Sequence, residues 1–309
     1  MKRVKLLVVI GLLLAALAAA TLFFVSRPPV LVVTDIPFAA LYGERRILRR
    51  QVTASLALFR RVTPVMIADD ASPDILIAAI LYAYREPFAV LFPSRFFAVA
   101  ERFHEEFPEI TAVAFRGVNP VSEPPEGGGS LKVFGTDRET DLLRAGLFAG
   151  AMGFVMAAER DEEEEEPDPQ RIHVLLHDRF TSPEGGELFA AAAAERDPDS
   201  AVVLASSPAH LPNMSAVSSI VVAGIGASVI EENPGIPTIL FTWLEPTLLP
   251  GNVVAVFDDS HWALAVPAVR MAAEGVSFGA IPSKTLIFSR RIADNSLTRL
   301  LKRLARTEP

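Results

Sequence analysis

Short apolar runs alternate with longer stretches of helical periodicity along most of this chain. Residues 30–34 form a β-branched run that ends at Asp35, and a helix-like stretch over residues 44–61 follows it. Three further short apolar runs continue this alternation, at residues 64–67, 88–91 and 110–114. Short apolar strands separated by helices predict a parallel sheet that helices cover on both faces.

Residues 119–130 interrupt this alternation. They contain three prolines and a run of three glycines, which sustain neither a helix nor a strand, so we expect a loop that is a domain boundary or a flap. A strand over residues 131–134 follows, and Thr136-Asp137 caps a predicted helix that runs from Arg138 towards residue 158. Small residues such as Gly146 and Gly150 in this helix favour a close-packed face.

A second series of alternating elements begins at Arg171. We expect helices over residues 183–195 and 228–232, one more after the strand that ends at residue 257, and a basic amphipathic helix at the C-terminus. The predicted strands of this series are residues 172–176, 201–204, 219–223, 236–241, 252–257 and 284–288. Two such series predict an α/β protein of two lobes, each a parallel sheet flanked by helices.

The N-terminal segment is apolar over residues 6–25 and follows the basic residues Lys2, Arg3 and Lys5. Roughly 20 apolar residues suffice to span a bilayer as a helix, and the basic residues favour a cytoplasmic N-terminus. Residues 1–26 are therefore predicted to be a membrane anchor, with the body on the outer side. The small residues 18–20 leave a cleaved signal peptide open as the alternative. In both cases we expect a periplasmic or otherwise extracytoplasmic protein, tethered to the cytoplasmic membrane or secreted.

Composition narrows the classes of function. The chain has no cysteine, which excludes disulfides, thiolate-bound metals and a lipid-modified cysteine. Its net charge of −8 argues against a nucleic-acid partner, and the acidic run over residues 159–166 is expected to be a solvated loop. His173 and His177 flank a strand and no third metal ligand is evident. The sequence contains no P-loop, nucleophile elbow or dinucleotide-binding glycine motif, so we expect neither an enzyme nor a cofactor.

Polar and aromatic residues close behind the predicted strands are the candidate ligand contacts, because ligands bind at the carboxyl ends of the strands in an open parallel sheet. Carboxylates there can accept hydrogen bonds from ribose-like hydroxyls, and aromatic side chains can stack on a planar ring. For each residue the alternative is a helix cap or core packing. The candidates are Asp35, Phe38, Asp69, Asp137, Asp178, Phe180, Trp243, Glu245 and Asp258.

A family resemblance rests on two segments. Residues 133–150 combine a strand, an acidic turn and a helix with a Leu-x-x-Gly-like pattern, and Asp35-Ile36-Pro37-Phe38 places an aromatic residue three positions after an acidic one. In these features the chain resembles type I periplasmic substrate-binding proteins, and among them the basic membrane protein family, which includes purine nucleoside receptors. Pro37 and Ala39 stand where that family has polar residues beside the aromatic one.

The resemblance also implies a division of the chain. The first crossing between the lobes would lie at residues 133–150 and the second at residues 243–252. Lobe 1 would comprise residues 30–135 and 252–283, and lobe 2 would comprise residues 136–251 and 284–309. Asp258 and Asp259 would then follow a strand of lobe 1.

The function implied by the resemblance is that of an extracytoplasmic solute-binding protein. Such a protein closes on a small molecule, such as a nucleoside or a sugar, by hinge motion and delivers it to an ATP-binding-cassette (ABC) transporter. Its partners would be the ligand, the permease and, through the N-terminal helix, the membrane. A membrane-anchored ligand sensor that passes occupancy to a partner receptor is the alternative, and a pair of lobes with a structural role is a third.

Overall fold

A computed structural model of the chain describes residue 14 and residues 21–117, 131–160, 171–224, 227–292 and 294–306. Most of the predicted anchor, the proline- and glycine-rich loop and residues 161–166 of the acidic run lie outside these residues. Within the described part of the chain, no helix has both the length and the apolar character that crossing a bilayer requires. The described residues divide into two compact units, each built around one sheet.

The first sheet has six strands in the order β11-β5-β4-β3-β1-β2. Neighbouring strands from β2 to β5 are parallel, and every residue of β1 is buried, as expected for a strand with both faces covered. The carboxyl ends of these strands therefore meet at one edge. The strands are β1 (Val30–Asp35), β2 (Val62–Ile67), β3 (Ala89–Phe92), β4 (Thr111–Phe115), β5 (Leu131–Thr136) and β11 (Phe278–Ile281).

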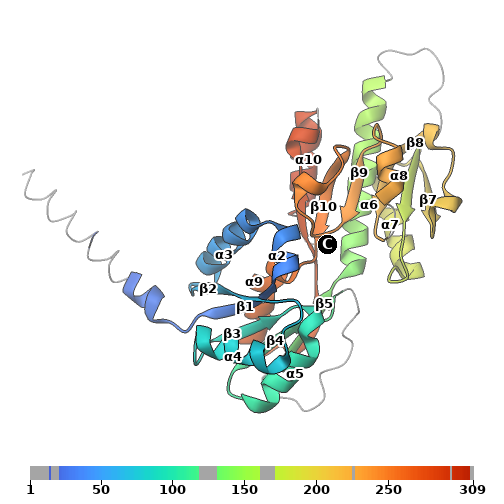
Figure 1. Cartoon of the computed structure of the whole chain (residues 1–309). Coiled ribbons are helices and arrows are strands. Elements are labelled where there is room, and N and C mark those ends of the chain that lie inside the picture. The colour runs from blue at the N-terminus through green and yellow to red at the C-terminus, as the bar shows by residue number, and fades with distance from the viewer. Residues whose placement is uncertain are drawn as a thin grey trace, which may run out of the picture. The chain divides into compact units, whose positions relative to one another are not determined.

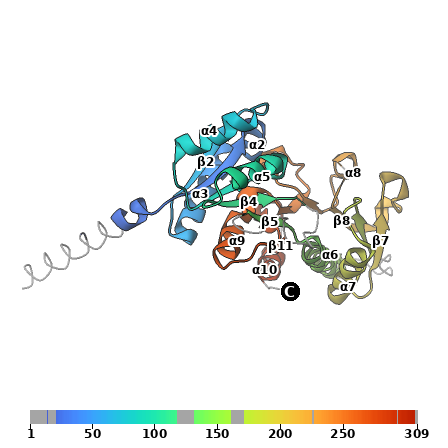
Figure 2. The same ribbon diagram turned by 90° about the horizontal axis from the view of Figure 1, so that it is seen from below.

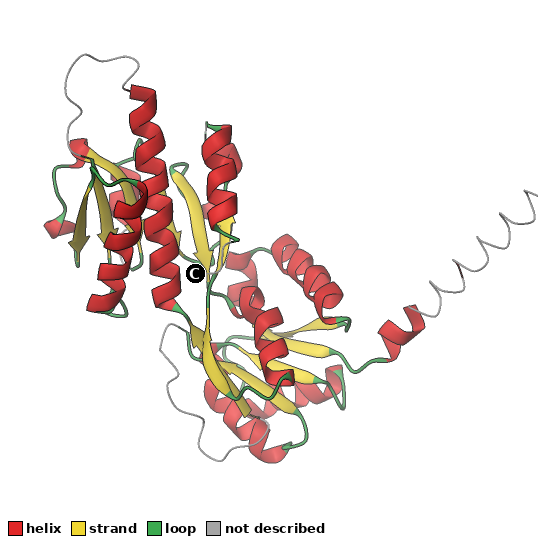
Figure 3. Cartoon of the chain, turned by 180° about the vertical axis from the view of Figure 1, so that it is seen from behind, coloured by secondary structure: helices red, strands yellow, loops and turns green. Residues whose placement is uncertain are grey.

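Helices flank the first sheet (Figures 1 and 3). Their starts follow from local sequence: Ser72 accepts a hydrogen bond from the backbone N–H of Ile75, and Pro73 fills the first helical position, where a missing N–H is tolerated. In the core, the rings of Phe92 and Phe103 lie 5.6 Å apart. The elements are α2 (Ile36–Tyr42), α3 (Glu44–Leu58), α4 (Pro73–Ala83), the 3₁₀ turn η1 (Ser94–Phe96) and α5 (Phe97–Glu106).

The second sheet has the order β12-β10-β9-β8-β6-β7. Its strands are parallel except β12, which runs antiparallel to β10 at the edge. The predicted parallel sheets with helices on their faces are thus confirmed in both units. The strands are β6 (Ile172–Leu176), β7 (Ala201–Ala205), β8 (Val217–Val222), β9 (Thr238–Phe241), β10 (Val253–Asp258) and β12 (Lys284–Ile287).

Helices α6 (Arg138–Arg160) and α7 (Pro183–Arg196) lie side by side in the second unit (Figures 1 and 2). A Cβ atom at Gly146 or Gly150 would lie 2.3 Å from a backbone carbonyl oxygen of α7, so only glycine permits this approach. The expected close-packed face is therefore real. The remaining elements are α8 (Ala227–Glu232), α9 (His261–Ala273), α10 (Asn295–Leu304), η2 (Pro208–His210), η3 (Met214–Ala216), η4 (Pro246–Leu248) and η5 (Ser289–Arg291).

The structure places β10 in the second sheet, whereas the resemblance implied that this strand belongs to lobe 1. β10 pairs in parallel with β9 and antiparallel with β12, and the boundary between the units falls inside α9, after Leu264. Asp258 and Asp259 therefore belong to the second unit. Alternation of strands and helices gives the order of elements along the chain, but it does not say which sheet each strand joins.

Candidate functional site

Asp35 ends β1 at the carboxyl edge of the first sheet. Its side chain is buried, and Oδ1 accepts a hydrogen bond of 2.7 Å from the backbone N–H of Phe38, which makes Asp35 the N-cap of α2. Phe38 is itself buried and stacks on Tyr42 with 4.9 Å between the ring centroids. The acidic-to-aromatic spacing that suggested a ligand motif is thus also the start of a short helix.

Arg95, which was not among the predicted site residues, joins two that were. It follows β3 in the η1 turn, and its Nη1 lies 3.3 Å from Oδ1 of Asp35. Its Nη2 forms an ion pair with the carboxylate of Asp69 and a hydrogen bond of 3.2 Å to the carbonyl oxygen of the same residue. The side chain of Arg95 remains 40% exposed. We call Asp35, Asp69 and Arg95 the first-sheet cluster.

In the second unit, a second cluster forms around Arg138, the first residue of α6. Its Nη2 lies 3.6 Å from Oδ2 of Asp178, which follows β6, and its guanidinium carbon lies 4.5 Å from the ring centroid of Phe241 at the end of β9. Oδ1 of Asp178 accepts hydrogen bonds from the backbone N–H of Phe180 and the hydroxyl of Thr181. Asp178 therefore fixes its own loop and orients one oxygen toward Arg138.

Two further carboxylates lie at the end of β10. Asp258 is fully buried, and its Oδ1 accepts a hydrogen bond of 3.1 Å from the N–H of Ser260, which orders the start of α9. The neighbouring Asp259 is half-buried, and burial raises the pKa of its carboxyl to about 6, with the charge of Asp258 adding to the rise and Arg138 opposing it. We call Arg138, Asp178, Asp258 and Asp259 the second-sheet cluster.

Five of the nine candidates lie outside the two clusters, and the buried Phe38 described above is one of them. Both carboxylate oxygens of Asp137 accept hydrogen bonds from Thr140, so Asp137 caps α6 as predicted from sequence. Phe180 is 36% exposed. Trp243 and Glu245 are half-buried in the segment that follows β9.

His173 and His177 do not form a pair. The ring of His173 is buried between Asp197 and Ser219, with 3.0 Å from Nε2 to the carboxylate and 2.7 Å from Nδ1 to the hydroxyl. Arg171 binds the same carboxylate at 2.6 Å. An Asp-His-Ser chain of this kind can activate a nucleophile, but all three side chains are fully buried at the amino ends of the strands, where no substrate reaches them. Within the described residues, no group of three His, Asp or Glu side chains could hold a metal ion.

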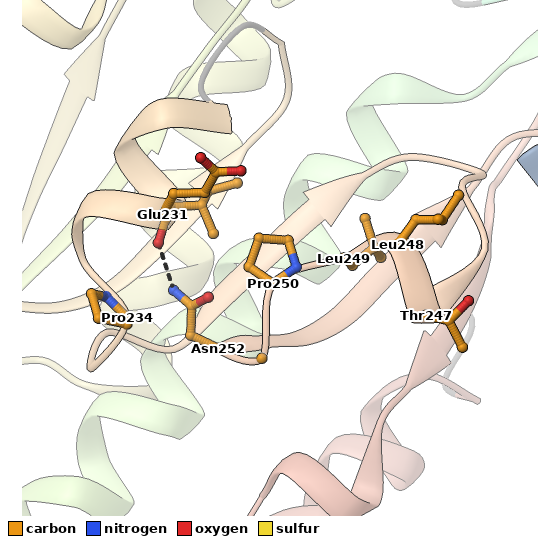
Figure 4. Close-up of a pocket in the computed structure, with 9 residues that line it drawn as sticks. Glu231, Pro234, Thr247, Leu248, Leu249, Pro250 and Asn252 are labelled. Carbon is orange, nitrogen blue, oxygen red and sulfur yellow. Dashed lines mark hydrogen bonds between the residues drawn. The ribbon is translucent and has the colours of Figure 1, made fainter.

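A pocket of about 550 Å³ opens elsewhere in the second unit, beside the amino ends of β9 and β10 (Figure 4). Asn252 lines this pocket, and its Nδ2 donates hydrogen bonds to the carbonyl oxygens of Ile230, Asn233 and Ile236. The pocket contains none of the nine predicted contacts. Its lining residues are Ile230, Glu231, Pro234, Thr247, Leu248, Leu249, Pro250, Gly251 and Asn252.

Comparison with known proteins finds similarity only at the level of structure. No family model matches the chain, and no curated protein matches it. The chain is similar to a transcriptional activator of the comK gene from Bacillus halodurans, at 13% identity and a TM-score of 0.54, over 89% of this chain and 95% of that one. It is also similar to an ABC transporter solute-binding protein from Conexibacter woesei, at 11% identity and a TM-score of 0.54, over 91% and 95% of the two chains.

At these identities the comparisons show the fold and no more. The chain has a two-lobed α/β fold of the periplasmic-binding-protein type, in which each lobe is a mostly parallel sheet flanked by helices. The fold resemblance stated from the sequence is therefore confirmed, while membership of the basic membrane protein family stays a prediction.

Proposed function

We propose that the chain is an extracytoplasmic solute-binding protein that closes on a small polyhydroxylated molecule, a sugar or a nucleoside, and delivers it to an ABC transporter. The observation that carries this proposal is that each sheet presents a charged cluster at the carboxyl ends of its parallel strands. That edge is where ligands bind in folds of this kind.

The chemistry of the clusters suits a ligand with many hydroxyl groups. Carboxylates only accept hydrogen bonds, a guanidinium only donates them, and a hydroxyl does both, so adjacent hydroxyls can bind the two kinds of group together. In the first-sheet cluster, the partly exposed Arg95 lies between two carboxylates. In the second-sheet cluster, Arg138 lies near Asp178 and Asp259.

The charge balance favours a neutral ligand. The first-sheet cluster has two carboxylates and one guanidinium, and the second has three carboxylates and one guanidinium. Carboxylates outnumber guanidinium groups in both, so neither offers the excess of positive charge that recognition of a phosphate requires. We therefore expect binding of free sugars or nucleosides and not of their phosphates.

A thermal-shift screen of the full chain tests the proposal. The compounds are ribose, arabinose, galactose, adenosine and guanosine, with ribose 5-phosphate and adenosine monophosphate as charged counterparts. A ligand at a hundred times its Kd adds about 2.7 kcal/mol to the free energy of unfolding, which raises the melting temperature measurably. The proposal predicts a rise with at least one neutral compound and a smaller one with its phosphate; no rise with any neutral compound contradicts it.

Variants of the clusters then locate the site. Arg138→Gln keeps a polar side chain but removes the charge, and we expect it to weaken binding of the compound found by at least tenfold. Arg196→Gln, on the partly exposed surface of α7, is the matched control. Trp243→Ala should weaken binding by a few kcal/mol if the indole stacks on a ring, whereas an equal loss of folding stability would identify Trp243 as a core residue.

A ligand sensor is the second candidate, and the similarity to a transcriptional activator favours keeping it. In that case the same ligand would bind, but the bound protein would associate with a receptor and not with a permease. Cross-linking of the tagged chain in native membranes, with and without the ligand, distinguishes the two by the partner recovered.

A further inference from the structure

Helix α3 carries an exposed apolar stripe that no described element covers. Its side chains are Leu48, Val52 and Leu56, which are 60%, 51% and 66% exposed, and Phe59 directly after the helix, which is 69% exposed. Spacings of four, four and three residues place all four on one side of the helix. At 1.5 Å per residue the stripe is about 16 Å long.

Phe59 has an unusual backbone. It ends α3 in the left-handed conformation, with φ of 51°, and it is the sole non-glycine residue with positive φ among those described. Glycine normally occupies this position, since a side chain there is strained. Strained residues cluster at functional sites, so an exposed aromatic ring on a strained backbone indicates that the ring binds something outside the first unit.

The stripe is flanked by positive charge in a protein that is otherwise acidic. Residues 44–61 contain six arginines and one acidic residue, although the whole chain has a net charge of −8. Arg45 and Arg49 are exposed on α3 beside the apolar residues. An apolar face bordered by arginines is typical of helices that lie on an anionic lipid surface.

The C-terminal end of the stripe, at Phe59, is hydrogen-bonded to the residues that follow the predicted membrane anchor. Nη1 of Arg27 donates a hydrogen bond of 3.3 Å to the carbonyl oxygen of Phe59, and Nη1 of Arg60 donates one of 3.2 Å to the carbonyl oxygen of Pro28. Arg27 also lies over the ring of Phe23, 4.8 Å from its centroid. The described residues at the end of the predicted anchor, from Phe23 to Pro28, therefore connect to the chain at Phe59 and Arg60.

We propose that this stripe of α3 lies against the outer leaflet of the membrane that the N-terminal segment enters, with Phe59 deepest and the arginines on anionic lipid headgroups. The inference rests on the predicted tether but not on the identity of the ligand. It makes α3 a lipid-binding face that fixes the orientation of the first unit on the membrane.

Single-cysteine labelling of the full chain tests the proposal, because the natural sequence has no cysteine. Phe59→Cys, Leu56→Cys and Leu48→Cys are labelled with nitrobenzoxadiazole and reconstituted into vesicles of equimolar phosphatidylcholine and phosphatidylglycerol. Tyr82→Cys is the matched control, because Tyr82 is 95% exposed on α4 of the same unit. Unchanged melting temperatures verify that each labelled variant is folded.

The expected result is quenching by spin-labelled lipid in the order Phe59, Leu56, Leu48, with no quenching at Tyr82. Omitting phosphatidylglycerol, or introducing Arg45→Glu together with Arg49→Glu, should reduce quenching at least twofold. Flotation with vesicles at alkaline pH reports the tether separately. Loss of flotation overturns the tether and with it the proposal. If the protein floats with the vesicles but the labels on the stripe are not quenched, the tether stands and the lipid-binding face is wrong. The lipid-binding face is also wrong if the labels are shielded by a second copy of the protein and become exposed on dilution.

Discussion

Asp141 gives the sharpest test of the electrostatics of this fold. It lies in the first turn of α6 and is fully buried. Its Oδ1 accepts a hydrogen bond of 2.9 Å from the N–H of Ser283, whereas Oδ2 has no hydrogen-bond partner among the described residues. Burial raises the pKa of this carboxyl to about 7, against the opposing effects of Ser283, Arg138 and Arg144. The change to examine is Asp141→Asn.

The sign and size of the effect follow from the two pKa values. A carboxyl whose pKa rises from 3.8 in the unfolded chain to about 7 in the folded protein binds more protons when folded. The free energy of unfolding therefore falls as pH rises from about 4 to about 7. Between pH 5 and pH 8 this single group removes about 2 to 3 kcal/mol. Asn cannot ionise and keeps an acceptor for Ser283, so the variant lacks this loss.

Urea unfolding of the wild type and of Asp141→Asn at pH 5, 6, 7 and 8 measures the difference. The constant penalty for placing an amide in the buried site cancels, because only the slope with pH is compared. Asp137→Asn is the control, since it changes a carboxyl one turn earlier in the chain and leaves Asp141 in place. Parallel curves for the wild type and Asp141→Asn would refute the reasoning.

Two more changes test the packing of the second unit and its buried Asp197–His173–Ser219 hydrogen bonds, and both are measured by urea unfolding. Gly146→Ala should lower the free energy of unfolding by about 1–3 kcal/mol despite the better helix propensity of alanine, because α6 and α7 must separate. The control is Gly251→Ala, since Gly251 has open space around it. Equal stabilities of the two variants would contradict the close approach of the helices. Asp197→Ala removes the carboxylate that binds His173 and should lower the free energy of unfolding by about 3 kcal/mol. Its control, Asp199→Ala, changes an exposed residue and should have little effect. A small effect of both would show that the buried hydrogen bonds contribute nothing to stability.

The sequence predicts most of the strands because a buried parallel strand has a strong local signal. Runs of Val, Ile and Leu bounded by polar residues identify β1, β6 and β10 to within one residue. β11 was missed, since Phe278–Ile281 contains Gly279 and only one residue of the strand is buried. Sheet membership of β10 depends on its pairing with β9 and β12, and no local sequence pattern contains that information.

The candidate site could be predicted in part, for a related reason. The rule that ligands bind at the carboxyl ends of strands selected Asp35, Asp69, Asp178 and Asp258, and the structure places each of them at such an edge. Whether a carboxylate there caps a helix or binds a cation depends on its neighbours in space. Arg95 and Arg138 were missed because each is an ordinary basic residue in the sequence and acquires its meaning only through carboxylates from other strands.

Hydrogen–deuterium exchange of the full chain, with and without the neutral compound that gives the largest thermal shift, tests the central claim most directly. We predict slower exchange in the segments that hold the two clusters, at residues 35–38, 68–71, 93–96, 137–140, 177–181 and 258–260. Residues 247–252, which line the pocket at the opposite ends of the strands, should not change. Protection of that pocket with unchanged exchange at the clusters would contradict the account and move the binding site to the other end of the second sheet.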